Sequence, residues 1–119
     1  MVLVKAISTN ISSCVIHEDT KVILASAFAN CTSLTNITIP ESLTHIGEAA
    51  FLSTGLTNIK IPESVKIISY GAFMGCRKLR SISFGGTINQ WNTISLGSDW
   101  NCDISATEVI CSDGVVKLK

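Results

Sequence analysis

The chain has 119 residues, no formal net charge and 15% charged residues, compared with roughly 25% in ordinary globular proteins. This length allows one domain with its own hydrophobic core. A neutral chain has no electrostatic basis for binding nucleic acid or an anionic membrane surface, and no apolar run approaches the ~20 residues of a membrane-spanning helix. Five cysteines, an odd number at low density, predict reduced and buried thiols rather than a disulfide framework.

Residues 2–7 are mostly apolar, and we expect them to pair as an extra strand over the N-terminal end of the fold. The N-terminal stretch lacks the basic, apolar and small-residue regions of a signal peptide. We therefore expect either a small protein or a fragment of a longer one from which an export signal has been removed.

From residue 11 onwards the chain repeats a unit of about 22 residues. Two copies, at residues 34–51 and 56–73, are almost identical; a degraded copy precedes them at 11–28, and a modified copy follows at 79–96. One unit alone is too short to bury its own apolar side chains. The repetition predicts a solenoid in which equivalent side chains of successive coils stack at the ~4.8 Å spacing of adjacent strands.

Each unit combines a strand with a tight turn. The alternation Ile37-Thr38-Ile39 is the period-two pattern of a half-buried strand, and Pro40 ends the strand because it cannot donate a hydrogen bond. The Ala-Phe-x-x-Cys segments are too short for a regular helix and predict a single helical or 3-10 turn. The stacking columns are Phe28, Phe51 and Phe73; Ile23, Ile46 and Ile68; and Cys31, Thr54 and Cys76.

Residues 85–119 depart from the unit, and we interpret them as a modified last copy followed by a cap that protects the end of the stack. With Gly85 in the proline position, counting along the chain predicts Trp91 in the isoleucine column and Leu96 in the phenylalanine column. We treat 1–119 as a single domain, with an N-terminal edge over 1–10 and repeats over 11–84.

The end of the cap, residues 108–118, predicts a β-hairpin that turns at an Asp-Gly pair at 113–114. Cys102 and Cys111 belong to the same cap. Two alternatives stay open for them: a disulfide across the cap, or two free thiols.

The pattern Leu-x-x-Ile-x-Ile-Pro-x-Ser-Val/Leu-x-x-Ile-x-x-x-Ala-Phe-x-x-Cys resembles the BspA-like (Treponema pallidum-type) leucine-rich repeat. Residues 34–54 and 56–76 match it closely, 11–31 match it loosely, and Gly86-Thr87 followed by Trp91 resembles the terminal flank of bacterial members. The resemblance implies a right-handed leucine-rich-repeat solenoid, mainly β, of about three to four coils plus a C-terminal cap. It also implies kinship with bacterial and protozoan cell-surface or secreted proteins that bind host proteins or other cells.

Few side chains are suited to catalysis or metal binding. The two histidines, His17 and His45, have no partner at a metal-ligand spacing, and the cysteines form no C-x-x-C pair. Nucleophile-elbow, phosphate-loop and zinc-protease motifs are absent from the sequence. We therefore predict no enzyme activity, cofactor or metal site; a hydrolase that uses Asp99, Asp103 or Cys102 is the remaining alternative.

In the resemblance, the Leu-x-x-Ile-x-Ile segments form a concave sheet whose outward side chains are small polar groups with a few basic ones. These side chains predict a protein-binding face made of Thr35, Asn36, Thr38, Thr57, Asn58, Lys60, Arg80, Ser81 and Ser83. The simpler interpretation is that they only keep the sheet soluble, since Arg80 is the one residue of a type that often dominates binding energy.

The resemblance and the lack of catalytic motifs together imply a non-catalytic module for protein–protein interaction or adhesion. Its expected partner is a host or cell-surface protein, without nucleic acid and without membrane insertion. The alternative is a structural repeat unit that has no dedicated ligand and associates with itself through its open N-terminal edge.

Overall fold

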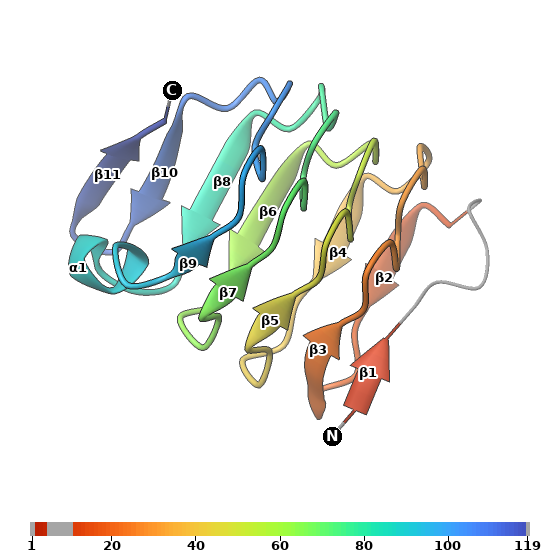
Figure 1. Cartoon of the computed structure of the whole chain (residues 1–119), viewed down its shortest axis with the longest axis horizontal. Coiled ribbons are helices and arrows are strands. Elements are labelled where there is room, and N and C mark those ends of the chain that lie inside the picture. The colour runs from red at the N-terminus through yellow and green to blue at the C-terminus, as the bar shows by residue number, and fades with distance from the viewer. Residues whose placement is uncertain (1, 5–10, 119) are drawn as a thin grey trace.

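The computed structural model of the protein describes residues 2–4 and 11–118. The chain winds into a flattened coil with two strand layers, and each turn of the coil contributes a strand to each layer (Figure 1). Its principal dimensions are 36 × 30 × 22 Å. The predicted fold class, a mainly β solenoid of stacked repeats, is confirmed.

The first layer is a parallel five-stranded sheet in the order β1-β3-β5-β7-β9. Its strands are β1 (Val2–Val4), β3 (Thr20–Ile23), β5 (His45–Ile46), β7 (Ile67–Ile68) and β9 (Ser95–Leu96). β1 pairs with β3, so the predicted N-terminal strand is confirmed for residues 2–4. The remainder of that prediction, 5–7, lies outside the described residues.

The second layer contains a parallel pair, β2-β4, followed by a four-stranded sheet in the order β6-β8-β10-β11 (Figure 1). Its strands are β2 (Ser13–Val15), β4 (Asn36–Thr38), β6 (Asn58–Ile61), β8 (Ser81–Phe84), β10 (Glu108–Cys111) and β11 (Gly114–Lys117). β10 and β11 form the predicted antiparallel hairpin. Because Cys111 pairs with Gly114, the connecting residues are Ser112 and Asp113 rather than the predicted Asp-Gly pair.

The core between the layers is built from stacked columns of identical side chains. The rings of Phe28 and Phe51 lie 5.3 Å apart and within 3° of parallel, and those of Phe51 and Phe73 lie 5.2 Å apart and within 4°. All three rings are buried, as are Ile23 and Ile46 in the neighbouring column. The ring separation is close to the strand spacing, so strand pairing and ring stacking reinforce each other.

The Ala-Phe segments form consecutive hydrogen-bonded turns rather than the predicted helical or 3-10 turn. In the first copy the N–H of Ala27 donates to the carbonyl of Leu24, and the N–H of Cys31 donates to that of Phe28, at 3.1 Å each. The residue before each of these donors, Ser26 and Asn30, has a positive φ, which a right-handed helix cannot accommodate. The left-handed residues in these turn columns are Ser26, Asn30, Ala49, Ser53, Gly71, Gly75, Asp99 and Asp103.

The last copy contains an insertion that changes its register. β9 pairs Leu96 with Ile68, so Leu96 continues the isoleucine column, and its predicted place in the phenylalanine column is wrong. The predicted isoleucine column for Trp91 is wrong for the same reason. The extra residues form α1 (Ile88–Trp91), which begins with a reciprocal cap between Thr87 and Gln90 and is the one helix in the described part of the chain.

Two tryptophans close the C-terminal end of the stack. Trp100 is buried, packs edge-on against Phe73 with ring centroids 6.2 Å apart, and lies 5.7 Å from the ring of Trp91. The backbone N–H of Phe73 donates to the carbonyl of Trp100, the same bond that Phe51 makes with Ala72 one coil earlier. Trp100 therefore occupies the position in its coil that Ala72 occupies in the preceding one, and it packs against Phe73 at the end of the phenylalanine stack.

Cys102 and Cys111 are separate thiols and form no disulfide, so of the two predicted alternatives the structure has the second. The Cys76 thiol donates to the carbonyl of Phe51 at 2.9 Å and lies 3.1 Å from the hydroxyl of Thr54. Thr54 replaces cysteine in its column, and its buried hydroxyl is accommodated because this contact gives it a partner.

Stability should fall at alkaline pH because of these thiols. Burial raises the pKa of Cys14, Cys31 and Cys76, and burial together with the Asp113 carboxylate raises the pKa of Cys111. The unfolded thiols ionise near about pH 8.5, so the unfolded state loses protons first. The stabilisation is complete below that pH and is lost as the pH rises through the folded pKa values. Urea unfolding at about pH 7 and about pH 9.5 under reducing conditions measures the difference.

The control is a variant with Cys31→Ala and Cys76→Ala, in which the alkaline loss should be smaller. If that variant has the same pH dependence as the native sequence, the thiols do not cause it.

Candidate functional site

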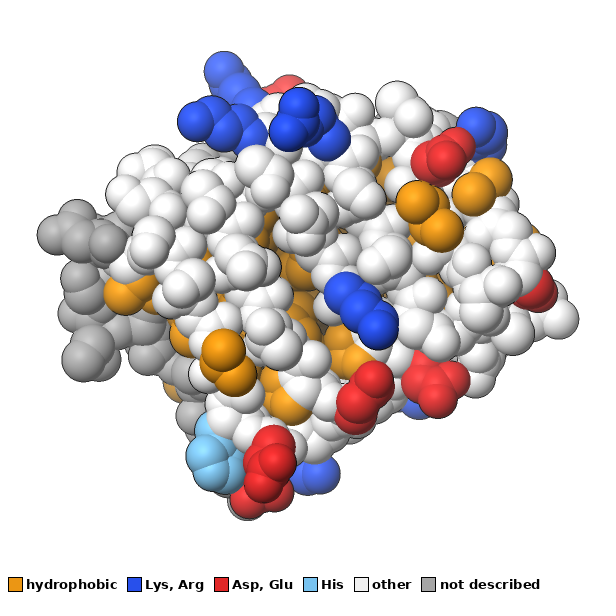
Figure 2. Space-filling view, turned by 180° about the vertical axis from the view of Figure 1, so that it is seen from behind, with side chains coloured by type: hydrophobic (Ala, Val, Ile, Leu, Met, Phe, Trp, Pro, Cys, Tyr) orange, Lys and Arg blue, Asp and Glu red, His pale blue; other side chains and the backbone are white. Residues whose placement is uncertain are grey.

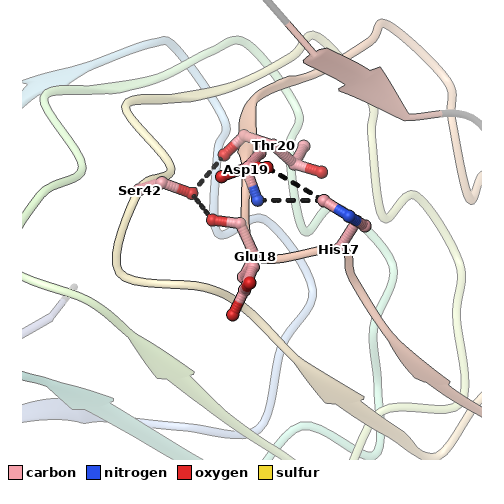
Figure 3. Close-up of polar contacts among 5 residues, drawn as sticks. All are labelled: His17, Glu18, Asp19, Thr20 and Ser42. Atoms are coloured by element: carbon pink, nitrogen blue, oxygen red, sulfur yellow. Dashed lines mark hydrogen bonds and ion pairs between the residues drawn. The ribbon is translucent and has the colours of Figure 1, made fainter.

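His17 belongs to a hydrogen-bonded turn at the end of β2 (Figure 3). Its Nδ1 atom accepts a bond from the backbone N–H of Asp19 at 3.0 Å and lies 3.9 Å from the Asp19 carboxylate. The Ser42 hydroxyl from the next coil lies 2.6 Å from the carbonyl of Glu18 and 2.7 Å from that of Thr20. These contacts fasten one coil to the next and are structural.

Backbone conformation accounts for the two aspartates of the alternative hydrolase site. Asp99 and Asp103 have φ values of 55° and 61° in the two turn columns that need left-handed residues, and aspartate tolerates that conformation better than most residues. Cys102, between them, is a partly exposed free thiol. Within residues 2–4 and 11–118, no group of histidine, cysteine and acidic side chains is arranged to hold a metal ion.

The predicted binding residues lie on or beside the outward side of the second strand layer. This side faces the viewer in Figure 2. The pairing of β6 with β8 places Asn58 beside Ser81 and Lys60 beside Ser83, and Thr38 occupies the same position as Lys60 in its own repeat, on β4. We call this surface the polar face. It comprises Thr35, Asn36, Thr38, Thr57, Asn58, Lys60, Arg80, Ser81 and Ser83, of which Thr57 and Ser83 are half-buried and the others exposed.

Some of the hydroxyl and amide groups on this face already have partners. The Thr35 hydroxyl donates to the carbonyl of Ser12 at 3.3 Å, and the Asn58 amide donates to the Thr57 hydroxyl at 3.4 Å. Their exposed neighbours Asn36 and Thr38 make no side-chain hydrogen bond within the described ranges. The face therefore presents unpaired polar groups on strands that the core holds in place.

Charged side chains border the polar face in an ordered way. Basic residues gather where the strands begin and acidic residues where they end (Figure 2). Arg77, Lys78 and Arg80 immediately precede β8, whereas Glu41 and Glu63 follow the ends of β4 and β6. Charge on this face is thus polarised along the strand direction.

Sequence reasoning missed the exposed apolar residues on this same layer. Val15 on β2 is 79% exposed, and Ile110 and Val115 on the C-terminal hairpin are 46% and 44% exposed. The sequence has no signal for the hairpin pair, because Val109, Ile110 and Cys111 are consecutive apolar residues; the alternating burial along β10 is visible only in the structure. Assigning these residues only to a cap concealed that the hairpin extends the polar face.

The family of the chain can be stated from its sequence match. Residues 7–116 match the model of the BspA type leucine rich repeat region, with 6 copies.
The chain belongs to the BspA-type leucine-rich repeat family.
The resemblance predicted from the stacked phenylalanine and isoleucine columns is therefore confirmed.

A solved structure supports the same assignment for this BspA-type chain. The fold is similar to the crystal structure of a leucine-rich repeat protein from Bacteroides ovatus, with a TM-score of 0.69 and 29% sequence identity. The match covers 87% of this chain and 31% of that protein, so this chain spans about a third of the length of the solved relative. A comparison with curated proteins found no match.

Family and fold together suggest the general class of function. BspA-type repeats are modules for protein interaction and are generally not enzymes. In the part of the chain that the structure describes, no helix has the length and apolar character needed to cross a bilayer.

Proposed function

We propose that this BspA-type module is a non-catalytic binding module that recognises a protein partner through its polar face. The observation that carries the proposal is the ordered exposure of Asn36, Thr38 and Lys60 on strands whose opposite sides are fixed in the core. A rigid strand surface loses little conformational entropy on binding, which favours recognition by polar groups.

The setting we propose for this binding is adhesion by a cell-surface or secreted bacterial protein, with a host or cell-surface protein as the partner. Membership of the BspA-type family and similarity to a Bacteroides protein support this setting. A surface of this size binds weakly when alone, and several copies or additional repeats would increase the avidity. Such avidity suits an adhesive module in a longer repeat protein.

Site-directed photo-crosslinking tests which face binds. A photoreactive side chain at Thr38 lies on the polar face, whereas one at Lys66, an exposed position beside β7, lies on the other layer. After incubation with surface proteins of candidate host cells, we expect discrete crosslinked proteins from Thr38 and only background from Lys66. Equal crosslinking from both positions would contradict the proposal.

The second candidate is self-association, as a structural unit, through the outer edge of β1. It is favoured by the position of β1 at the end of the first layer, where no further described strand pairs with it. Sedimentation over a wide range of concentrations tests this alternative, and a chain that stays monomeric throughout would contradict it.

A further inference from the structure

The C-terminal hairpin adds a pair of exposed apolar side chains to one half of the polar face. Ile110 and Val115 pair directly across the hairpin, and 46% and 44% of their surfaces remain exposed. Their strand neighbours Val109 and Cys111 are buried on the opposite side. The apolar pair is therefore held in place by the core while its side chains contact solvent.

This apolar pair lies in register with a basic side chain on the same face. Lys60 pairs with Ser83, and Ser83 pairs with Ile110. Residues that pair directly in a sheet point to the same side, so Lys60 and Ile110 lie two strand spacings, about 10 Å, apart across the small side chain of Ser83. An apolar centre beside a polar, charged margin is the usual anatomy of a protein-binding patch.

On the hairpin Lys117 pairs with Glu108, whereas the basic groups on and before β6 and β8 have no acidic partner among the described residues. In residues 11–118 the ion pairs involve His17 with Asp19 and Lys117 with Glu108, the latter at 2.7 Å. Neither pair includes Lys60 or Arg80, and neither includes the nearby Arg77 and Lys78. Exposed cations that lack an internal partner attract a complementary carboxylate.

We propose that this half of the polar face, over β6, β8, β10 and β11, docks an acidic segment of a partner protein that also carries an apolar side chain. The apolar side chain packs on Ile110 and Val115, and the carboxylates contact Lys60 and Arg80. Nucleic acid or a sulfated glycan would match the charges but leave the apolar pair uncovered. This inference rests on the proposed protein-binding function and names the chemistry of its partner.

A short synthetic peptide with two leucines flanked by glutamates on both sides tests the proposal. Two matched peptides replace either the glutamates with glutamine or the leucines with serine. We expect amide resonances of β6, β8, β10 and β11 to shift on titration with the acidic–apolar peptide, and both matched peptides to bind more weakly. Raising the salt from about 50 mM to about 300 mM should weaken binding, because the charged contacts are exposed to solvent.

Variants of the intact chain assign the contacts. Lys60→Glu with Arg80→Glu should raise the Kd by about fivefold or more, and Ile110→Ser with Val115→Ser should also weaken binding. The charge-matched control is Lys21→Glu with Lys66→Glu, on exposed lysines of the other layer, which should change the Kd by less than about twofold.

Three outcomes would overturn the proposal. They are equal weakening by both charge reversals, tighter binding of heparin or DNA than of the peptide, and self-association in sedimentation that Ile110→Ser with Val115→Ser abolishes. If the peptide fails to bind while crosslinking at Thr38 still captures host proteins, the partner chemistry is wrong but the proposed function stands.

Discussion

Replacing Phe51 with alanine should lower the free energy of unfolding by roughly 3–5 kcal/mol. Phe51 is fully buried, and its ring stacks on Phe28 on one side and on Phe73 on the other. The small residues beside it, Ala50 and Ala72, cannot fill the space that the ring would leave. Since small domains have only about 5–15 kcal/mol of total stability, the variant should be near the limit of folding.

Urea denaturation followed by circular dichroism measures this loss, and two controls define its cause. Phe51→Leu keeps most of the volume and should cost far less, under about 2 kcal/mol. Tyr70→Ala removes a ring that is 46% exposed and should cost about 1 kcal/mol or less. A similar loss for Phe51→Ala and Tyr70→Ala would show that the stacked column does not dominate stability.

The column that contains Phe51 could be predicted from sequence because repetition makes every position visible several times. Isoleucine at 23, 46 and 68 and phenylalanine at 28, 51 and 73 occur at equivalent places, and stacking identical side chains is the way short units bury an apolar face. The strands before Pro40 and Pro62 follow from the same alignment. Fold and core were therefore predictable together.

The turns were less predictable because their conformation depends on backbone angles that several residue types share. Ser26, Ala49 and Gly71 occupy one column and all have positive φ, although glycine alone among them favours that conformation. Hydrogen bonds to the next coil hold it, such as that from the N–H of Ser26 to the carbonyl of Glu48 at 2.8 Å. Tertiary contacts here override local preference, so inspection of one copy cannot reveal it.

The candidate site was predictable only where the repeat continues. Alternation identified the outward residues on β4, β6 and β8, which form the polar face in the structure. The contribution of Ile110 and Val115 was missed because the hairpin has no repeat pattern to place it next to β8, and only the pairing of Ile110 with Ser83 does so. The structure is therefore required to identify a binding surface that extends beyond the last repeat.

The register of the last coil predicts that Trp100→Ala lowers the free energy of unfolding much more than Leu96→Ala does. Trp100 is 6% exposed and contacts the rings of Phe73 and Trp91, so its loss should cost roughly 3–5 kcal/mol. Leu96 lies at the outer end of the first layer and is 40% exposed. Its truncation should cost only about 1 kcal/mol.

Urea unfolding of the two variants separates the alternative registers. Counting along the sequence places Leu96 on the phenylalanine stack, which would make Leu96→Ala the more damaging change. The insertion of α1 places Leu96 beside Ile68 instead and brings Trp100 against Phe73. A larger loss for Leu96→Ala than for Trp100→Ala would contradict this register, and with it the position of the hairpin that carries Ile110 and Val115.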